Sequence, residues 1–469
     1  MSERAKSVPT GRVRRTAKVG GLLGTEVAKS YATKAANLVR SPQGRSAANG
    51  RRRLEAAEHM VDVLGEMKGA AMKMGQMVSM IDPGGLPPDE LEGFQAKLGE
   101  LRDRAPRASF DDMRKVIEHD LEDRIPNLFA EFDADAAAAA SIGQVYRARL
   151  HDGREVAVKV QYPGVDAAVR ADLQNLGLLM RAARRFAPGL DAKATALELR
   201  ERITEELDYE HEAQAQRAFA RRWRAHPFIV IPNVITDMCR TRVLVTEWVD
   251  GISFERVKEA PRATRDRVGE IVLRFFYGSM YRFGQFSGDP HPGNFLLLHD
   301  GRVAFLDFGM TKTVPRRRLD MELDVLRAGL GGDADGVHAG LAALGFFERD
   351  DPRFDRDRVL DHVRALNAWY AVDEPVTITP EYVSSLLVDA GDPRSQYWDL
   401  MKNETMPADS LFATRMQGMT LAAIGQLRAT ANWHRVMAEW LYGEDPSSPL
   451  GQAEAEFFGS RSALTKLAA

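Results

Sequence analysis

Residues 288–294 read GDPHPGN, and thirteen residues after the last of these begins DFG, at 307–309. Two short apolar segments lie between the motifs and flank an Asp-Gly turn, a pattern that predicts a β-hairpin. Because a hairpin returns the chain to its starting point, we expect the side chains of Asp289, Asn294 and Asp307 to share one site. Carboxylate and amide oxygens are the ligands that Mg²⁺ prefers. The stretch therefore predicts a site for a divalent cation.

The interval of five residues between Asp289 and Asn294 equals the Asp-to-Asn spacing of the protein-kinase catalytic loop. In that loop the Asp orients or deprotonates the attacking hydroxyl, and the Asn binds a second Mg²⁺. Taken alone, the loop is better explained as a Pro/Gly turn with an Asx cap, and a lone DFG often occurs by chance. The joint spacing is far more specific, and it predicts Asp289 as catalytic and Asn294 and Asp307 as metal ligands.

A lysine follows a run of small apolar residues in VAVK, at 156–159. Lys159 at this place on a strand can point inward and pair with nucleotide phosphates, although a single such lysine is more often a surface side chain. Just before it, residues 138–145 read AAASIGQV, where kinases have a G-x-G-x-x-G-x-V loop. The third Gly and the Val are in place and the first two glycines are alanines, which predicts a stiffer loop over the phosphates. The nucleotide contacts expected from this loop are Ala138, Ala139, Ala140, Ser141, Gly143 and Val145. The alternative for 135–140 alone is a helix start in low-complexity Ala.

Two further segments complete the predicted nucleotide site. Residues 206–212, ELDYEHE, form a charged helix in which one Glu should pair with Lys159, as the helix-C Glu of kinases does. Residues 244–249, LVTEWV, read as a strand entering a hinge, where backbone groups of Glu247 and Val249 would meet the adenine edge. Together these motifs predict ATP and Mg²⁺ as ligands and an α+β, two-lobed protein-kinase-like fold with a helical C-terminal lobe.

Charge is unevenly spread along the 469 residues. Residues 1–53 hold thirteen Lys/Arg and two Glu, a balance of +11, and the rest of the chain carries −14. Such an arm suits an anionic membrane surface or, on charge alone, nucleic acid; we expect no nucleic-acid partner. No apolar run approaches the roughly 18 residues that span a bilayer, and Cys239 is the one cysteine, which excludes an internal disulfide. A cytoplasmic location is expected, with peripheral attachment at the inner membrane face left open.

The sequence resembles the UbiB family of atypical kinases, also called AarF or ADCK. The resemblance is dense over roughly residues 54–320 and is carried by six motifs in order: KMGQ (73–76), the Ala-rich loop (138–145), QYPG after the lysine (161–164), ELD (206–208), the 289–294 loop and DFG. This resemblance implies that Glu212 is the partner of Lys159. It also implies that N-terminal helices lie over the site, with Lys73 and Gln76 facing Glu206 and Asp208.

Departures from ordinary protein kinases bear on the substrate. No long activation segment and no Ala-Pro-Glu follow Gly309, and Ser287, Gly288 and His291 replace the His, Arg and Lys around the kinase catalytic Asp. The resemblance therefore implies an ATPase or kinase that acts with a lipid or quinone-like small molecule rather than on proteins. The chain lacks the C-terminal transmembrane pair of several relatives, which weakens the quinone role. The alternative is a non-catalytic ATP-binding regulator or lipid-binding pseudokinase.

Five parts are expected along the chain. They are a basic arm (1–53), a family-specific helical extension with KMGQ (54–130), a kinase-like N-lobe (131–250), a helical C-lobe with both metal-binding motifs (251–446) and a frayed C-terminal tail (447–469).

Overall fold

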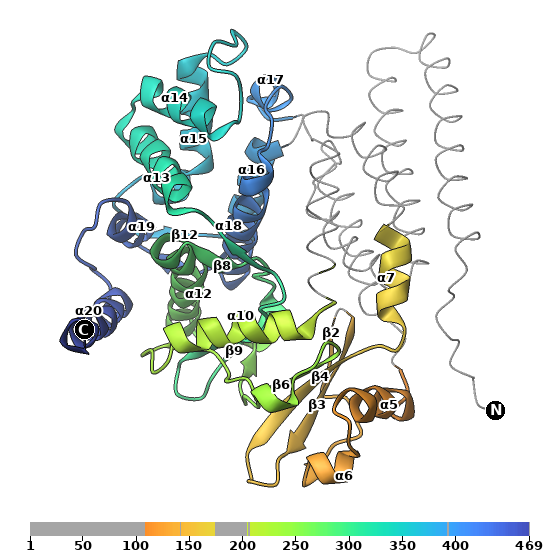
Figure 1. Ribbon diagram of the computed structural model, residues 1–469. Helices are drawn as coiled ribbons and strands as arrows, with labels where there is room; N and C mark the ends of the chain where they lie inside the picture. The colour runs from red at the N-terminus through yellow and green to blue at the C-terminus, as the bar shows by residue number, and fades with distance from the viewer. Residues whose placement is uncertain (1–107, 141, 174–203, 205–206, 392–393, 469) are drawn as a thin grey trace. The chain divides into compact units, whose positions relative to one another are not determined.

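The computed structural model describes residues 108–140, 142–173, 204, 207–391 and 394–468, and it divides the chain into two compact units. The first unit holds the described residues up to Tyr209 together with Met238–Val245 and Arg394. The second holds Glu210–Asp237, Thr246–Gly391 and the chain from Ser395 onward. In Figure 1 the first unit is mostly orange to yellow and the second green to blue. The predicted KMGQ segment lies outside the described residues.

A five-stranded sheet forms the core of the first unit. Four of its strands follow the order β1 (Glu131–Phe132), β3 (Gly143–Arg149), β4 (Glu155–Gln161) and β6 (Val243–Glu247). The fifth strand, β2 (Ala138–Ala140), also pairs with β3. Three alternate valines of β4, Val156, Val158 and Val160, are fully buried, as expected for a strand with one face toward a core. Strands β3 and β4 form an antiparallel hairpin, with Val145 opposite Lys159.

Helices accompany this sheet in the first unit: α5 (Phe110–Asp120), α6 (Ile125–Leu128) and α7 (Val165–Leu173). Ser109 caps the start of α5, because its hydroxyl accepts a hydrogen bond from the Asp112 N–H. At the other end of α5, Asp120 forms an ion pair with Arg242, next to the start of β6. Cys239 is buried.

Helix α12 (Arg262–Phe283) is the centre of the second unit, and fourteen of its residues are buried. Around it lie α10 (Tyr209–Arg222), α11 (Phe254–Val257) and two small sheets. One sheet has the order β5 (Ile229–Val230), β10 (Val303–Phe305), β9 (Phe295–Leu297) and β7 (Ile252–Ser253). The other pairs β8 (Gln285–Ser287) with β11 (Thr311–Thr313). The hairpin predicted between the two motifs, β9–β10, is confirmed.

The rest of the second unit is mostly helical, as the periodicity predicts. The elements are α13 (Arg316–Gly331), α14 (Ala334–Leu344), α15 (Arg356–Leu366), α16 (Pro380–Gly391), α17 (Trp398–Met401), α18 (Ala408–Leu427), α19 (Trp433–Leu441) and α20 (Pro449–Ala468), with a short sheet of β12 (Val376–Thr377) and β13 (Thr430–Ala431). The expectation of a frayed tail is wrong, since α20 occupies most of it. Leu450 and Glu454 of α20 are buried, and Glu454 pairs with Arg274 of α12. None of the described helices combines the length and apolar character needed to cross a membrane.

Candidate active site

Two strand pairs of the second unit bring together the loops 288–294 and 306–310. Strand β8 leads into the first loop and β9 leaves it, while β10 leads into the second loop and β11 leaves it. Because β8 pairs with β11 and β9 pairs with β10, the two loops lie next to each other at both of their ends. The pairing continues into the loops, where the Gly288 N–H donates to Met310 O and the Leu306 N–H to Asn294 O. The hairpin predicted between the two motifs is therefore confirmed, and a shared site for the side chains of Asp289, Asn294 and Asp307 stays a prediction.

The 288–294 loop is held by its own side chains. The His291 ring accepts a hydrogen bond from the Gly293 N–H at 3.0 Å and caps a turn of 3₁₀ helix over Pro292–Asn294. The side-chain nitrogen of Asn294 donates to Asp289 O at 3.3 Å. That bond orients the amide, so its carbonyl oxygen is the atom that can serve a cation.

Asp307 is half-buried and is oriented by its own loop. Its Oδ1 accepts from the Gly309 N–H at 3.0 Å, and its backbone carbonyl accepts from the Ser287 hydroxyl at 3.1 Å. The next residue, Phe308, is fully buried, with its ring 4.9 Å from that of Phe219 on α10. The carboxylate of Asp307 is therefore placed by a buried aromatic anchor one residue further along.

Glu212 lies on α10 and is 2% exposed. A Cβ atom added at Gly309 would lie 3.4 Å from Glu212 Oε2 and 3.5 Å from Asp307 Oδ1. The two carboxylates therefore converge on Gly309, which joins the helix-C position to the DFG loop within one unit. Two acids so close hold negative charge at one spot, an arrangement suited to a cation or a lysine amine.

The first unit carries Lys159, half-buried on β4, with its amine 4.9 Å from the centre of the Tyr209 ring. The Ala-rich stretch is a strand, β2, whose residues Ala138, Ala139 and Ala140 pair with Val145, Gln144 and Gly143. A Cβ at Gly143 would meet the Val160 carbonyl oxygen at 2.0 Å, so close approach of β4 requires glycine there. The pairing of Lys159 with Glu212 joins residues of different units and stays a prediction.

The remaining predicted site residues fall into two groups. Asp208 is half-buried at the end of the ELD segment, and the buried Gln161 donates to Leu207 O at 2.9 Å, which ties that segment to β4. Lys73, Gln76, Ser141 and Glu206 lie outside the described residues. The predicted roles of Asp208 and of these four residues stay predictions.

Glu247 is the last residue of β6 and is half-buried. Its hydrogen bonds limit which of its backbone groups could contact adenine. Its N–H donates to Asn233 O at 2.9 Å, and its carboxylate accepts from the Asn233 N–H and side-chain amide at 3.0 and 2.9 Å. Because the Glu247 N–H is already bonded to Asn233, the predicted adenine contacts are the Glu247 carbonyl and the backbone of the half-buried Val249.

The sequence analysis missed Arg415 of α18, whose Nη2 lies 4.0 Å from Asp289 Oδ1. Arg415 is more than a hundred residues from the loop, inside a segment that the sequence marked only as helical. No local pattern could have found it, because the contact depends on tertiary packing.

The comparisons with known proteins agree with this arrangement. A family model described as "ABC1 atypical kinase-like domain" matches residues 100–339, just over half of the chain. The rat protein named "Atypical kinase COQ8B, mitochondrial" is 33% identical over 282 residues, which cover 60% of this chain and 53% of the rat protein. The Caenorhabditis elegans "Atypical kinase coq-8, mitochondrial" is 27% identical over 404 residues, covering 83% and 52%. The chain thus spans about half the length of these curated relatives.

A solved structure is also similar. The complex of Rv3197 with erythromycin from Mycobacterium tuberculosis aligns with a TM-score of 0.60 and 30% identity, over 85% of this chain and 97% of that one. The family match and this likeness confirm the predicted α+β, two-lobed kinase-like fold class, and a kinase-like domain suggests ATP binding with a metal. The chain therefore belongs to the ABC1 family of atypical kinases, the family also called UbiB, AarF or ADCK.

Proposed function

We propose that this chain binds Mg-ATP and hydrolyses it in connection with a lipid or quinone-like small molecule, rather than phosphorylating proteins. The observation that carries the proposal is the pairing of the strands at both ends of the loops 288–294 and 306–310, the loops that carry Asp289, Asn294 and Asp307. An arrangement of this kind serves phosphoryl transfer, where catalysis is mainly positioning and electrostatic stabilisation.

The donor set suits Mg²⁺. The oxygens of Asp307 and Asn294 would hold the cation, and the cation would offset the negative charge of the phosphates. Among the described residues, no three His, Cys, Asp or Glu side chains gather as a metal site. Mg²⁺ commonly needs no such cage, since it uses one or two carboxylates together with substrate phosphates. Asp289 would accept a hydrogen bond from the attacking hydroxyl or water.

Lys159 and the Ala-rich hairpin would bind the triphosphate. Residues 138–140 of β2 pair with residues 143–145 of β3, which supports the proposal of a stiffer cover than a glycine loop. Glu212 would hold Lys159 toward the phosphates. Helix α13 begins at Arg316, seven residues after Gly309, which leaves little room for the segment on which kinases dock a protein substrate.

The acceptor or effector is proposed from the relatives. Two are named as COQ8-type atypical kinases, which favours a quinone-like phenol or lipid. The Rv3197 complex contains erythromycin, so a large, mostly apolar ligand is a second candidate, favoured by the 97% coverage of that structure. The mitochondrial relatives favour work at a membrane surface, which the basic arm 1–53 could contact.

The test is ATP turnover by the purified full chain with Mg²⁺, against a panel of small phenols, lipid vesicles and erythromycin. We expect turnover that rises with one class of ligand and is lost in Asp307→Asn. Binding of ATP without turnover under every condition would favour the alternative, a non-catalytic ATP-binding regulator or lipid-binding pseudokinase. In that case Asp289→Asn should keep full function in cells.

A further inference from the structure

Arg415 of α18 lies where the loops 288–294 and 306–310 meet. Its Nη2 is 4.0 Å from Asp289 Oδ1, and both of these side chains are only 12% exposed. Its Nη1 donates to the sulfur of Met310, at the end of the second loop, at 3.8 Å. The guanidinium therefore contacts one side chain from each loop of the candidate site.

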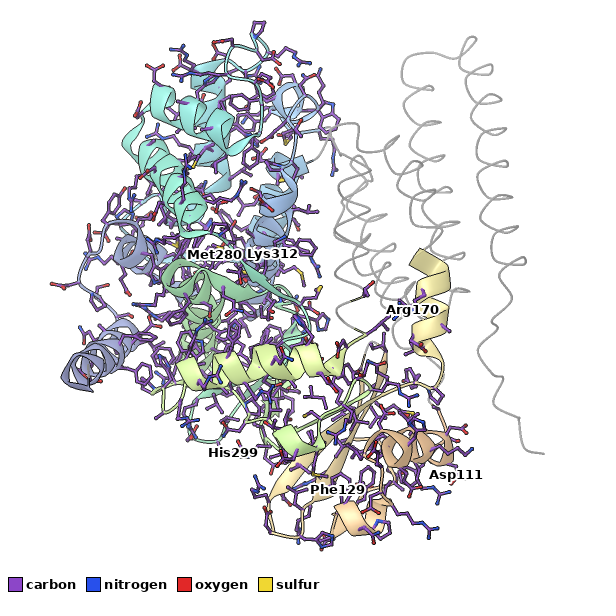
Figure 2. All side chains as sticks on the ribbon, in the orientation of Figure 1. Asp111, Phe129, Arg170, Met280, His299 and Lys312 are labelled. Carbon is purple, nitrogen blue, oxygen red and sulfur yellow. The ribbon has the colours of Figure 1, made fainter. Side chains whose placement is uncertain are left out.

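Helix α18 packs beside the strand that leaves the second loop. Met310 contacts Arg415, and two residues further along the chain the amine of Lys312, labelled in Figure 2, lies 5.2 Å from the Phe412 ring. Positions i and i+3 share a face of a helix, and positions i and i+2 share a face of a strand. The two contacts are therefore successive steps of one helix–strand interface. Met416, the next residue of α18, is fully buried, so Arg415 is held in place by a packed helix.

Neither loop contains a lysine or an arginine. Protein kinases have a Lys two residues after the catalytic Asp, and here that position is His291, whose ring accepts a hydrogen bond from the Gly293 N–H. A bound triphosphate would bring further negative charge to loops that already carry Asp289 and Asp307. Phosphoryl-transfer sites commonly offset such charge with a basic side chain as well as with Mg²⁺. Arg415 brings a cation to this place from another element.

The contacts of the guanidinium suit the binding of a phosphate. Its planar set of N–H donors matches pairs of phosphate oxygens. At 4.0 Å the contact with Asp289 is within ion-pair range but beyond hydrogen-bond distance. The donor on Nη1 meets a thioether sulfur, which is a weak acceptor. A phosphate oxygen would therefore offer Arg415 a stronger hydrogen bond than these contacts do, while α18 stays in place.

We propose that Arg415 binds the terminal phosphate of Mg-ATP. The inference rests on the proposed function, in which Asp289 accepts a hydrogen bond from the group that attacks this phosphate. Reacting atoms in such sites lie about 3–3.5 Å apart, so the terminal phosphate must lie beside Asp289, within reach of the Arg415 side chain. ADP lacks this phosphate. Arg415 is therefore a residue by which the site distinguishes ATP from ADP, and it lies beyond the 100–339 segment that the family model matches.

Calorimetric titrations of the full chain with Mg-ATP and with Mg-ADP test this role. In Arg415→Gln we expect the affinity for Mg-ATP to fall about tenfold or more, because charge-assisted hydrogen bonds are lost, and the affinity for Mg-ADP to stay within about twofold. Arg415→Lys keeps the charge and should recover part of the loss. Lys312→Gln removes the neighbouring cation and should change both affinities by less than about threefold, because a cation without direct contact is partly screened by solvent. Arg435→Gln, which removes an exposed Arg–Asp ion pair on α19, should change neither affinity.

The outcomes separate this inference from the function on which it rests. A wild type that does not bind Mg-ATP overturns both. Binding without turnover overturns the proposed hydrolysis, while the two affinities still decide the role of Arg415. Equal losses for ATP and ADP in Arg415→Gln, no loss for either, or an equal loss of ATP affinity in Lys312→Gln overturn the role of Arg415 alone.

The comparison of two nucleotides also guards against an effect of Arg415 on folding. A merely structural defect weakens the binding of ATP and ADP alike, so it does not imitate the expected result. Arg415→Met keeps the apolar stem against Met310 and replaces Arg415→Gln if that variant does not fold.

Discussion

The ring of Phe308 lies 4.9 Å from the ring of Phe219, so the residue between Asp307 and Gly309 packs on the helix that carries Glu212. Both rings are fully buried, and both also contact Phe275 of α12. An aromatic cluster of this kind couples the position of α10 to that of the DFG loop. The two carboxylates that converge on Gly309 thus depend on a shared apolar support.

Phe219→Ala should therefore impair the site as well as the fold. Truncating a buried Phe costs about 3–5 kcal/mol of stability, and here it also releases α10 from Phe308. We expect ATP turnover to fall at least about tenfold at a temperature where the variant is still folded. The matched control is Phe354→Ala, a buried ring stacked on Phe347 in the α13–α15 cluster. It should lose similar stability and keep turnover per folded molecule, as measured by circular dichroism and a coupled ATPase assay.

Two glycines should respond differently to the same added methyl group. A Cβ at Gly143 would lie 2.0 Å from Val160 O, so Gly143→Ala must push β3 from β4 and should strongly reduce expression or melting temperature. A Cβ at Gly309 meets Glu212 and Asp307 only at 3.4 and 3.5 Å, which is ordinary contact. Gly309→Ala should fold with a melting temperature near that of the wild type and bind Mg-ATP more weakly in a calorimetric titration. Equal melting temperatures for both variants would contradict this reading.

Ala140→Gly tests the Ala-rich strand. Ala140 pairs with Gly143 at the tip of the β2–β3 hairpin, next to the turn. A second glycine there loosens the hairpin locally, at a cost of about 1 kcal/mol or less. We expect the affinities for ATP and ADP to change while the protein stays folded. Unchanged affinities for both nucleotides would mean that the stretch does not touch phosphate.

Local patterns predicted much of this fold. The Asp-Gly turn between the two motifs predicted the β9–β10 hairpin, because such a turn depends on neighbours within a few residues. The two loops could be joined from sequence because a hairpin separates them. Arg415 and helix α20 were beyond such reasoning. Arg415 meets Asp289 only after α18 packs, and α20 is held by a partner on α12 about 180 residues earlier.

That partner, Arg274, is fully buried among three glutamates. Its guanidinium donates to Glu270, Glu439 and Glu454 at 2.7–2.9 Å, and the carboxylates come from α12, α19 and α20. The carboxylates raise the pKa of Arg274 further despite its burial, while burial raises the pKa of Glu454. The network is therefore a charged joint between three helices.

Arg274→Met should be strongly destabilising, because it leaves three glutamates without their shared cation. Removing one member of a buried ion-pair network costs about 3–5 kcal/mol. We expect a large fall in the denaturant midpoint, with α20 more accessible to limited proteolysis. Arg435→Gln, which breaks an exposed pair with Asp373, should leave the midpoint almost unchanged. A midpoint for Arg274→Met equal to that of the control would mean that this network does not hold the three helices together.

Glu404 should make stability depend on pH near neutrality. Burial raises its pKa to about 7 from its ordinary value of 4.5. The folded protein then binds more protons than the unfolded chain between these values, so stability falls as the pH rises from about 4.5 to 7. Glu404→Gln has no such charge and should be more stable than the wild type at pH 8 by about 1–2 kcal/mol, below the full value for such a shift because the side chain keeps some solvent contact. The advantage should vanish near pH 4, as urea unfolding at several pH values can show. An advantage that is the same at pH 4 and pH 8 would mean that the substitution acts through packing and not through the charge of Glu404.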